Sequence, residues 1–202
     1  MGSNRIILPL TVFLIAMAFA FVFTNKVQKE GPEIEEEVHP MPELLELTMQ
    51  NQNKEIISLK DLGDSYKLIY FGQLSASDLD WEAVLKMERM ASQNFKKPLT
   101  PIFFSLDPKR DTIPILQKSL QASAEHVQAL FPSQDKLDYL AKAYGIHYQK
   151  SELPNSNLNY TIDHNTWYYL TTPDYRILGS YPIQIQDERL IKEIIAHMKQ
   201  KH

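Results

Sequence analysis

Two short, aromatic-rich apolar runs, separated by a helical pattern, most limit what this chain can form. They cover residues 66–71 (YKLIYF) and 99–106 (LTPIFFSL), and both have the length and composition of buried strands. Strands that alternate with helices pack as a sheet with helices on its faces. The sequence therefore predicts an α/β sandwich.

Apolar periodicity places the other elements of this domain. The last helix has the clearest pattern, because Leu190, Ile191, Ile194, Ile195 and Met198 form one apolar stripe. No internal repeat or low-complexity tract interrupts the alternation of strands and helices. The sequence predicts further helices at residues 81–91, 112–120 and 137–144, and a closing hairpin formed by residues 167–170 and 176–181.

An apolar run at residues 6–23 precedes the domain. As a helix it would span about 27 Å, close to a hydrocarbon core of about 30 Å. A cleaved signal peptide is the alternative, since Ala18-Phe19-Ala20 fits a cleavage site, but the apolar run continues beyond it. We expect a single N-terminal transmembrane helix within residues 1–25, an acidic, proline-containing linker at 26–43 and a folded domain at 44–202.

The chain of 202 residues contains no cysteine. This excludes disulfides, thiolate nucleophiles, iron–sulfur clusters and cysteine-based zinc or copper sites. The formal net charge is −4, and general nucleic-acid binding requires a basic surface. We therefore expect no nucleic-acid partner and no thiol-based redox activity.

Three segments of the sequence carry a resemblance to a known family. Residues 70–80 (YFGQLSASDLD) lead from the first buried strand, residues 107–112 (DPKRDT) follow the second, and Asp163-His164 precedes the closing hairpin. In this order and at these separations they resemble the Sco/SenC family, thioredoxin-like copper chaperones of cytochrome c oxidase assembly. The resemblance extends from about Leu44 to Lys199. It implies a thioredoxin-like fold behind an N-terminal membrane anchor.

The resemblance also implies a copper site that this chain does not reproduce. In the family, two cysteines separated by three residues bind copper together with the histidine of the Asp-His segment. Ala76 and Asp80 occupy the two cysteine positions, and His164 alone remains of the three ligands. Copper(I) prefers soft thiolates, and thiol–disulfide exchange requires a sulfhydryl. We therefore expect no cofactor, although the family implies copper.

Two interpretations of the remaining polar residues stay open. Asp78, Asp80 and His164 would form an oxygen–nitrogen metal site, which suits zinc or copper(II) better than copper(I). Alternatively, Asp78 or Asp80 caps the following helix by accepting a backbone N–H bond. His164 is then a general base, a vestige, or a structural histidine hydrogen-bonded beside Asp163.

The basic residues of the second motif also allow two roles. Lys109 and Arg110 are suited to bind an anion or an acidic patch of a partner. They are equally suited to pair with Asp107 and Asp111 within the same loop. Both roles are compatible with a loop between a strand and a helix.

These observations lead to a prediction of function. We expect a non-catalytic assembly or interaction factor, not an enzyme; pairing Ser75 or Ser77 with His164 would lack a nucleophile elbow. The resemblance implies respiratory-oxidase subunits or copper-handling proteins as partners. Without an Arg- and Ser-rich transit segment, a bacterial inner membrane with a periplasmic domain is favoured over the mitochondrial inner membrane. The alternative is a metal-binding protein that uses Asp78, Asp80 and His164.

Overall fold

The computed structural model describes residues 42–74, 89, 93, 98–120, 127–154, 156–165, 167–183 and 187–200. The anchor expected within residues 1–25 lies outside these residues, and of the helix expected at 81–91 only Arg89 is described, as helical. In the part of the chain that is described, no helix combines the length and apolar character needed to cross a bilayer.

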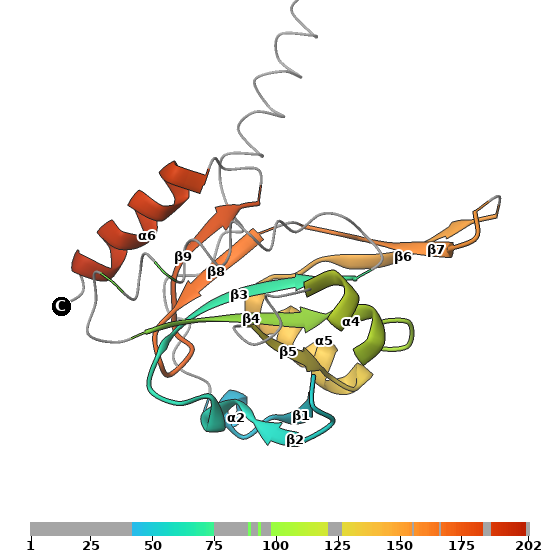
Figure 1. The fold of residues 1–202 in the computed structure, drawn as a ribbon, viewed down its shortest axis with the longest axis horizontal. Coiled ribbons are helices and arrows are strands. Elements are labelled where there is room, and N and C mark those ends of the chain that lie inside the picture. Colours follow the sequence, from blue (N-terminus) through green and yellow to red (C-terminus); the bar gives the residue numbers. More distant parts are fainter. Residues whose placement is uncertain are drawn as a thin grey trace, which may run out of the picture. The chain divides into compact units, whose positions relative to one another are not determined.

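A seven-stranded mixed sheet, in the order β2-β1-β5-β4-β3-β8-β9, forms the centre of the fold (Figure 1). The parallel pair β3 and β4 lies in its middle, as the two apolar runs predicted, and every residue of β3 is buried. The strands are β1 (Thr48–Asn51), β2 (Ile56–Ser58), β3 (Tyr66–Gly72), β4 (Leu99–Ser105), β5 (Gln128–Phe131), β8 (Trp167–Thr171) and β9 (Ile177–Pro182).

Helices cover both faces of this sheet, which confirms the predicted sandwich. Successive strand residues point to opposite faces, so each of the central strands contributes to two cores. One core joins Tyr70 and Phe103 to α4 (Ile113–Leu120) and α6 (Asp187–Gln200). The other joins Phe71 and Phe104 to α5 (Gln134–Tyr144), α2 (Pro42–Leu45) and the 3-10 helix η1 (Leu59–Leu62).

The end of α5 shows how local sequence sets a boundary. Leu137, Leu140 and Ala141 face the core, as their spacing predicted, and the helix ends where Gly145 takes a left-handed conformation with φ of 61°. The N–H of Ile146 then bonds the carbonyl of Ala141 at 2.7 Å, a common way to close a helix. The next strand begins only a few residues later, at Tyr148.

A separate two-stranded antiparallel sheet follows α5. Its strands are β6 (Tyr148–Leu153) and β7 (Asn159–His164), and they form a hairpin that extends away from the main sheet (Figure 1). The sequence pattern did not predict this hairpin, nor β1, β2 and β5. The central residues of β6 are polar (QKSE), so the apolar alternation typical of a half-buried strand is missing.

A charged side chain, that of Lys67, is fully buried among the described residues. Lys67 in β3 has no exposed surface, and its ammonium group donates hydrogen bonds to the carbonyls of Gly63 and Ser65, both at 2.8 Å. Burial lowers the pKa of this lysine to about 8. These bonds fix the turn that leads from η1 into β3.

Candidate functional site

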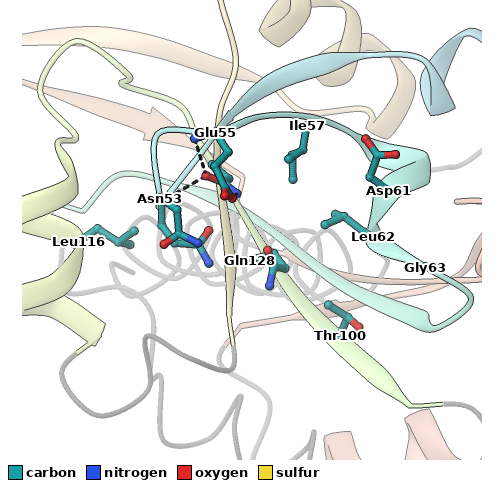
Figure 2. A pocket seen from close by; sticks show the side chains of 11 residues that line it. Asn53, Glu55, Ile57, Asp61, Leu62, Gly63, Thr100, Leu116 and Gln128 are labelled. Carbon is teal, nitrogen blue, oxygen red and sulfur yellow. Dashed lines mark hydrogen bonds between the residues drawn. The ribbon is translucent and has the colours of Figure 1, made fainter.

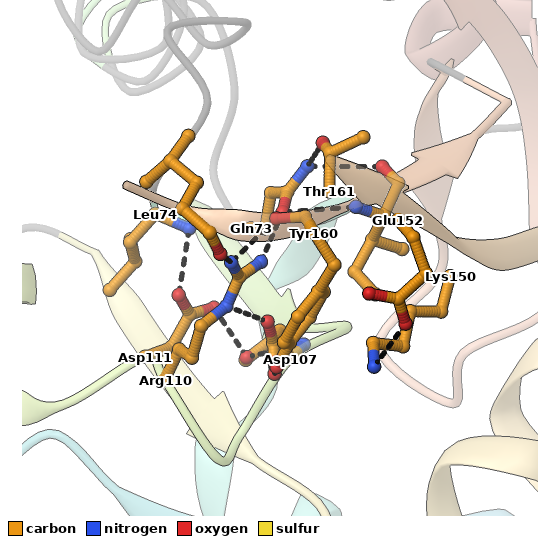
Figure 3. Close-up of polar contacts among 12 residues, drawn as sticks. Gln73, Leu74, Asp107, Arg110, Asp111, Lys150, Glu152, Tyr160 and Thr161 are labelled. Carbon is orange, nitrogen blue, oxygen red and sulfur yellow. Dashed lines mark hydrogen bonds and ion pairs between the residues drawn. The ribbon is translucent and has the colours of Figure 1, made fainter. Parts of the chain in front are cut away.

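The loops that follow β3 and β4 meet the β6–β7 hairpin at one end of the sheet (Figure 3). The N–H of Leu106 bonds the carbonyl of Gly72 at 2.8 Å, which holds the two loop entrances together. The carboxyl ends of parallel strands are the usual place for binding sites in α/β folds. This region is therefore the candidate site, and it contains the described parts of all three sequence motifs, with residues 70–74 of the first.

Arg110 lies at the centre of the polar contacts in this region. Its Nε donates to Asp107 Oδ2 at 2.5 Å, and its guanidinium carbon lies 3.6 Å from the centre of the Tyr160 ring. The Tyr160 hydroxyl in turn donates to the other carboxylate oxygen of Asp107 at 3.1 Å. Of the two roles considered for Arg110, the structure shows pairing within the loop.

Side chains, rather than another strand, bond the outer edge of β7 (Figure 3). Arg110 Nη1 donates to the carbonyls of Leu158 at 2.9 Å and Tyr160 at 2.7 Å. Gln73 donates to the carbonyl of Ile162 at 3.0 Å and accepts from its N–H at 3.2 Å. We name Gln73, Asp107 and Arg110 the hairpin clasp, because they attach the hairpin to the loops after β3 and β4.

Asp111 provides a second connection between the same two loops, next to the clasp. Its carboxylate accepts the N–H of Leu74 at 3.0 Å and the hydroxyl of Ser105 at 2.5 Å. The side chain is almost completely buried. Burial, reinforced by the nearby Asp107 charge, raises the pKa of Asp111 to about 6, although the two hydrogen bonds and Arg110 oppose the rise.

This raised pKa gives a testable pH dependence. The fold favours protonated Asp111, so its contribution to stability is fully present below the unfolded pKa of 3.8 and is lost as pH rises through about 6. An Asp111→Asn variant keeps an acceptor for Leu74 and no longer ionises. Between pH 4 and pH 7, wild type should lose about 2 kcal/mol of unfolding free energy relative to this variant.

Urea unfolding at the two pH values measures this difference. Asp163→Asn, which removes an exposed carboxylate, is the matched control. A difference between wild type and Asp111→Asn that stays constant from pH 4 to pH 7 would contradict the proposed role of Asp111.

His164 is the last residue of β7 and lies beside β3. Its ring packs edge-on against Tyr70, with 6.2 Å between ring centres, and its Nδ1 lies 3.0 Å from the carbonyl of Asn165. Since a carbonyl only accepts, Nδ1 carries the proton, and Nε2 is the nitrogen with the lone pair in the neutral ring. This tautomer suits coordination through Nε2.

Asp163 does not orient the His164 ring. The two are neighbours in a strand, so their side chains point to opposite faces. The carboxylate of Asp163 instead accepts the hydroxyl of Ser151 across the hairpin. His164 is thus hydrogen-bonded beside Asp163, at the carbonyl of Asn165 rather than by the Asp163 carboxylate.

Gly72 allows Tyr70 to reach His164. A Cβ atom at position 72 would lie only 2.4 Å from Cε1 of the Tyr70 ring, far inside van der Waals contact. The Tyr70 ring thus lies over the backbone of Gly72 while packing against the histidine. The glycine of the first motif is required by this close approach.

One cavity lies at the candidate site, and another lies away from it. One, of about 580 Å³, lies at the base of the hairpin beside His147, Asp163 and His164. The other, of about 780 Å³, lies at the opposite end of β4 and contains no histidine among its described lining residues (Figure 2). Its lining includes Asn51, Gln52, Asn53, Glu55, Ile57, Asp61, Leu62, Gly63, Thr100, Leu116 and Gln128.

The expected Asp/His metal site remains a prediction. Ala76, Asp78 and Asp80 lie outside the described residues, as do Ser75 and Ser77. Within the described ranges, no group of three histidine, aspartate or glutamate side chains is placed to hold a metal ion. Of the residues named for the metal site and the two cysteine positions, His164 alone is among the described residues.

The sequence analysis missed two residues that shape the site. Gln73 was quoted within the first motif without a role, although it is a polar side chain that is almost fully buried after an apolar strand. Tyr160 lies outside the three motifs, and no spacing signal connects it to Arg110. Both act through contacts with distant segments, which local periodicity does not encode.

Comparisons with known proteins show which family this chain resembles. A family model described as SCO1/SenC matches residues 43–199. The human mitochondrial protein SCO1 homolog is 27% identical over 144 residues, covering 69% of this chain and 48% of the relative, so the chain spans about half of that protein. A SCO2-like protein of Rickettsia prowazekii is 26% identical over 145 residues, covering 70% of each chain.

A solved structure supports the same fold. The crystal structure of Arabidopsis thaliana ScoI with copper bound is 20% identical, with a TM-score of 0.68, and covers 76% of this chain and 96% of that chain. This likeness supports the expected thioredoxin-like fold for the described domain. Because the family model covers most of the chain and the fold agrees, the chain belongs to the SCO1/SenC family.

Proposed function

We propose that this protein is a non-catalytic, membrane-anchored SCO1/SenC family member that acts by binding other proteins in respiratory-oxidase assembly or copper handling. The observation that carries the proposal is the complete absence of cysteine from a chain whose hairpin and loops remain tied together by the clasp. The chain has no thiol for redox chemistry, but the loops and the hairpin around this region are still held together.

The donor set does not fit copper(I). A related structure is described as containing copper, but Ala76 offers no donor atom, and Asp80 offers a hard carboxylate oxygen. His164 provides one imidazole. A copper-transfer step through this region would therefore lack the soft ligands that hold the ion, and no such step is proposed.

The clasp favours a role for the intact surface. Asp107 is almost fully buried, and a buried charge is tolerated only when it is paired and hydrogen-bonded, as it is here by Arg110 and Tyr160. A network of this kind fixes the hairpin in one position and presents its outer face as a defined surface. Such a surface suits recognition of a partner protein.

The predicted anchor sets the location. The apolar run at residues 6–23 would place the domain at a membrane surface, with residues 26–43 as a spacer. We assign the domain to the periplasmic side of a bacterial inner membrane. Relatives from Rickettsia are compatible with a bacterial origin.

Affinity purification of the full chain from detergent-solubilised membranes tests this function. Respiratory-oxidase subunits or copper-handling proteins should be enriched over a control in which residues 1–43 carry an unrelated domain. Equal recovery with the control would remove the support for an assembly role.

Metal titration of wild type and His164→Ala separates this proposal from the alternative function. Copper(I), copper(II) and zinc are each added in competition with chelators of known affinity. We expect no binding that depends on His164. Tight, His164-dependent uptake of one ion would instead establish a metal-binding protein, with Asp78 and Asp80 as the next residues to replace.

A further inference from the structure

The two strands of the hairpin differ in how their outer edges are bonded. The outward backbone groups of Tyr160 and Ile162 in β7 bond the clasp. The ladder between β6 and β7 must then use the alternate pairs, Gln149 with Asp163 and Ser151 with Thr161. A bond from the Asn165 N–H to the carbonyl of His147 continues the same alternation.

It follows that the backbone groups of Lys150 and Glu152 point away from β7. Within the described part of the chain, β6 pairs with β7 and with no other strand. An outer strand with unpaired N–H and C=O groups is a template for another strand. The remaining question is which strand fits this edge.

The side chains of β6 favour a second β6 strand. In an antiparallel pairing about a two-fold axis at Ser151, Lys150 lies opposite Glu152 of the second copy, and the reverse pair forms by symmetry. Opposite charges directly across two strands stabilise a sheet. On the other face, Ser151 lies opposite its own copy, flanked by Thr161 from each hairpin, which forms a row of hydroxyl groups.

The neighbouring registers lack this complementarity. An axis at residue 150 places Lys150 opposite itself, and an axis at residue 152 places Glu152 opposite itself; like charges across strands are destabilising. The second of these also sets Lys150 opposite Pro154, which has no N–H to donate. Charge and backbone chemistry thus favour the register centred on Ser151 over its two neighbours.

We propose that the β6 edge is a self-association surface, in which two copies of this chain join their hairpins into one four-stranded antiparallel sheet centred on Ser151. The interface is separate from the region around His164, and it does not depend on the proposed function. Within one chain Lys150 and Glu152 bond each other at 2.8 Å. In the pair, Glu152 of the second copy lies opposite Lys150, and Lys150 of the second copy lies opposite Glu152.

The absence of cysteine makes disulfide cross-linking a direct test. In Ser151→Cys, the two introduced thiols lie on residues whose Cα atoms are about 4.5 Å apart in such a pairing, within the range that a disulfide spans. In the control Gln149→Cys, the equivalent atoms are about 13 Å apart, because the residue lies opposite position 153. The full chain in membrane vesicles is oxidised with diamide and separated on a non-reducing gel.

We expect a product of twice the chain's mass, formed by Ser151→Cys at least about fivefold more than by Gln149→Cys. Adding Lys150→Glu to Ser151→Cys should abolish it, because Glu then faces Glu. Adding Glu152→Lys as well exchanges the two charges and should restore it.

Three results would overturn the proposal. Equal products from the two cysteine variants would indicate random collision. Insensitivity to Lys150→Glu, or no restoration by the double exchange, would exclude this register. A product of any other mass would identify a partner that is not a second copy.

Discussion

The Arg110→Ala substitution should lower the free energy of unfolding by about 3 kcal/mol relative to wild type. The substitution leaves the buried Asp107 carboxylate without its cation and removes the donors to the carbonyls of Leu158 and Tyr160. Breaking a buried ion pair costs about 3–5 kcal/mol, and the lower end applies because the Arg110 side chain is 24% exposed. Urea unfolding followed by far-UV circular dichroism measures the change.

A surface pair provides the matched control for this measurement. Arg189 Nε bonds Glu193 at 2.8 Å within α6, and the Arg189 side chain is 75% exposed. Arg189→Ala should therefore cost no more than about 0.5 kcal/mol. If the two arginine variants lost the same stability, the clasp would not hold the hairpin in the way described. Arg110→Lys, which keeps the charge but not the planar fork, should fall between them.

A Phe71→Ala variant should lose about 4 kcal/mol of unfolding free energy, the largest effect that we expect from a single side chain. Its ring has 1% exposure and packs against Phe104 and Tyr144, with ring centres 5.0 Å and 5.4 Å apart. Removing it takes apolar area out of the core and leaves a cavity that the central strands are too constrained to fill.

The Phe71 prediction is checked by thermal and urea unfolding. Ile56→Ala is the control, because Ile56 is 69% exposed and loses little burial on truncation. A loss of less than about 1 kcal/mol for Phe71→Ala would show that this core is less tightly packed than the structure indicates.

The central part of the fold followed from the sequence because its signals are local. Residues 66–71 and 99–106 are short, aromatic-rich runs that are mostly apolar, and α5 places its core residues at helical spacing. The strand β5 escaped detection because four residues are too few to show a period. The hairpin escaped it for another reason: the central residues of β6 are polar, and the side chains that hold β7, Gln73 and Arg110, lie far away in the sequence.

The candidate site was predictable only in part. His164 and the loop containing Asp107 were identified through a family resemblance, and the structure brings both to the end of the sheet that contains Gly72. The sequence places Asp163 and His164 side by side, whereas the strand separates their side chains onto opposite faces. Adjacency in sequence indicates cooperation only after the local conformation is known.

The attachment of β7 through side chains has a consequence for how this chain can change by mutation. Backbone ladders between strands survive almost any substitution, because every residue except proline supplies the same N–H and C=O groups. The hairpin instead depends on the identities of Gln73 and Arg110. Single codon changes can therefore loosen or redirect the hairpin while the sheet beneath it stays intact, so its geometry is open to selection independently of the fold.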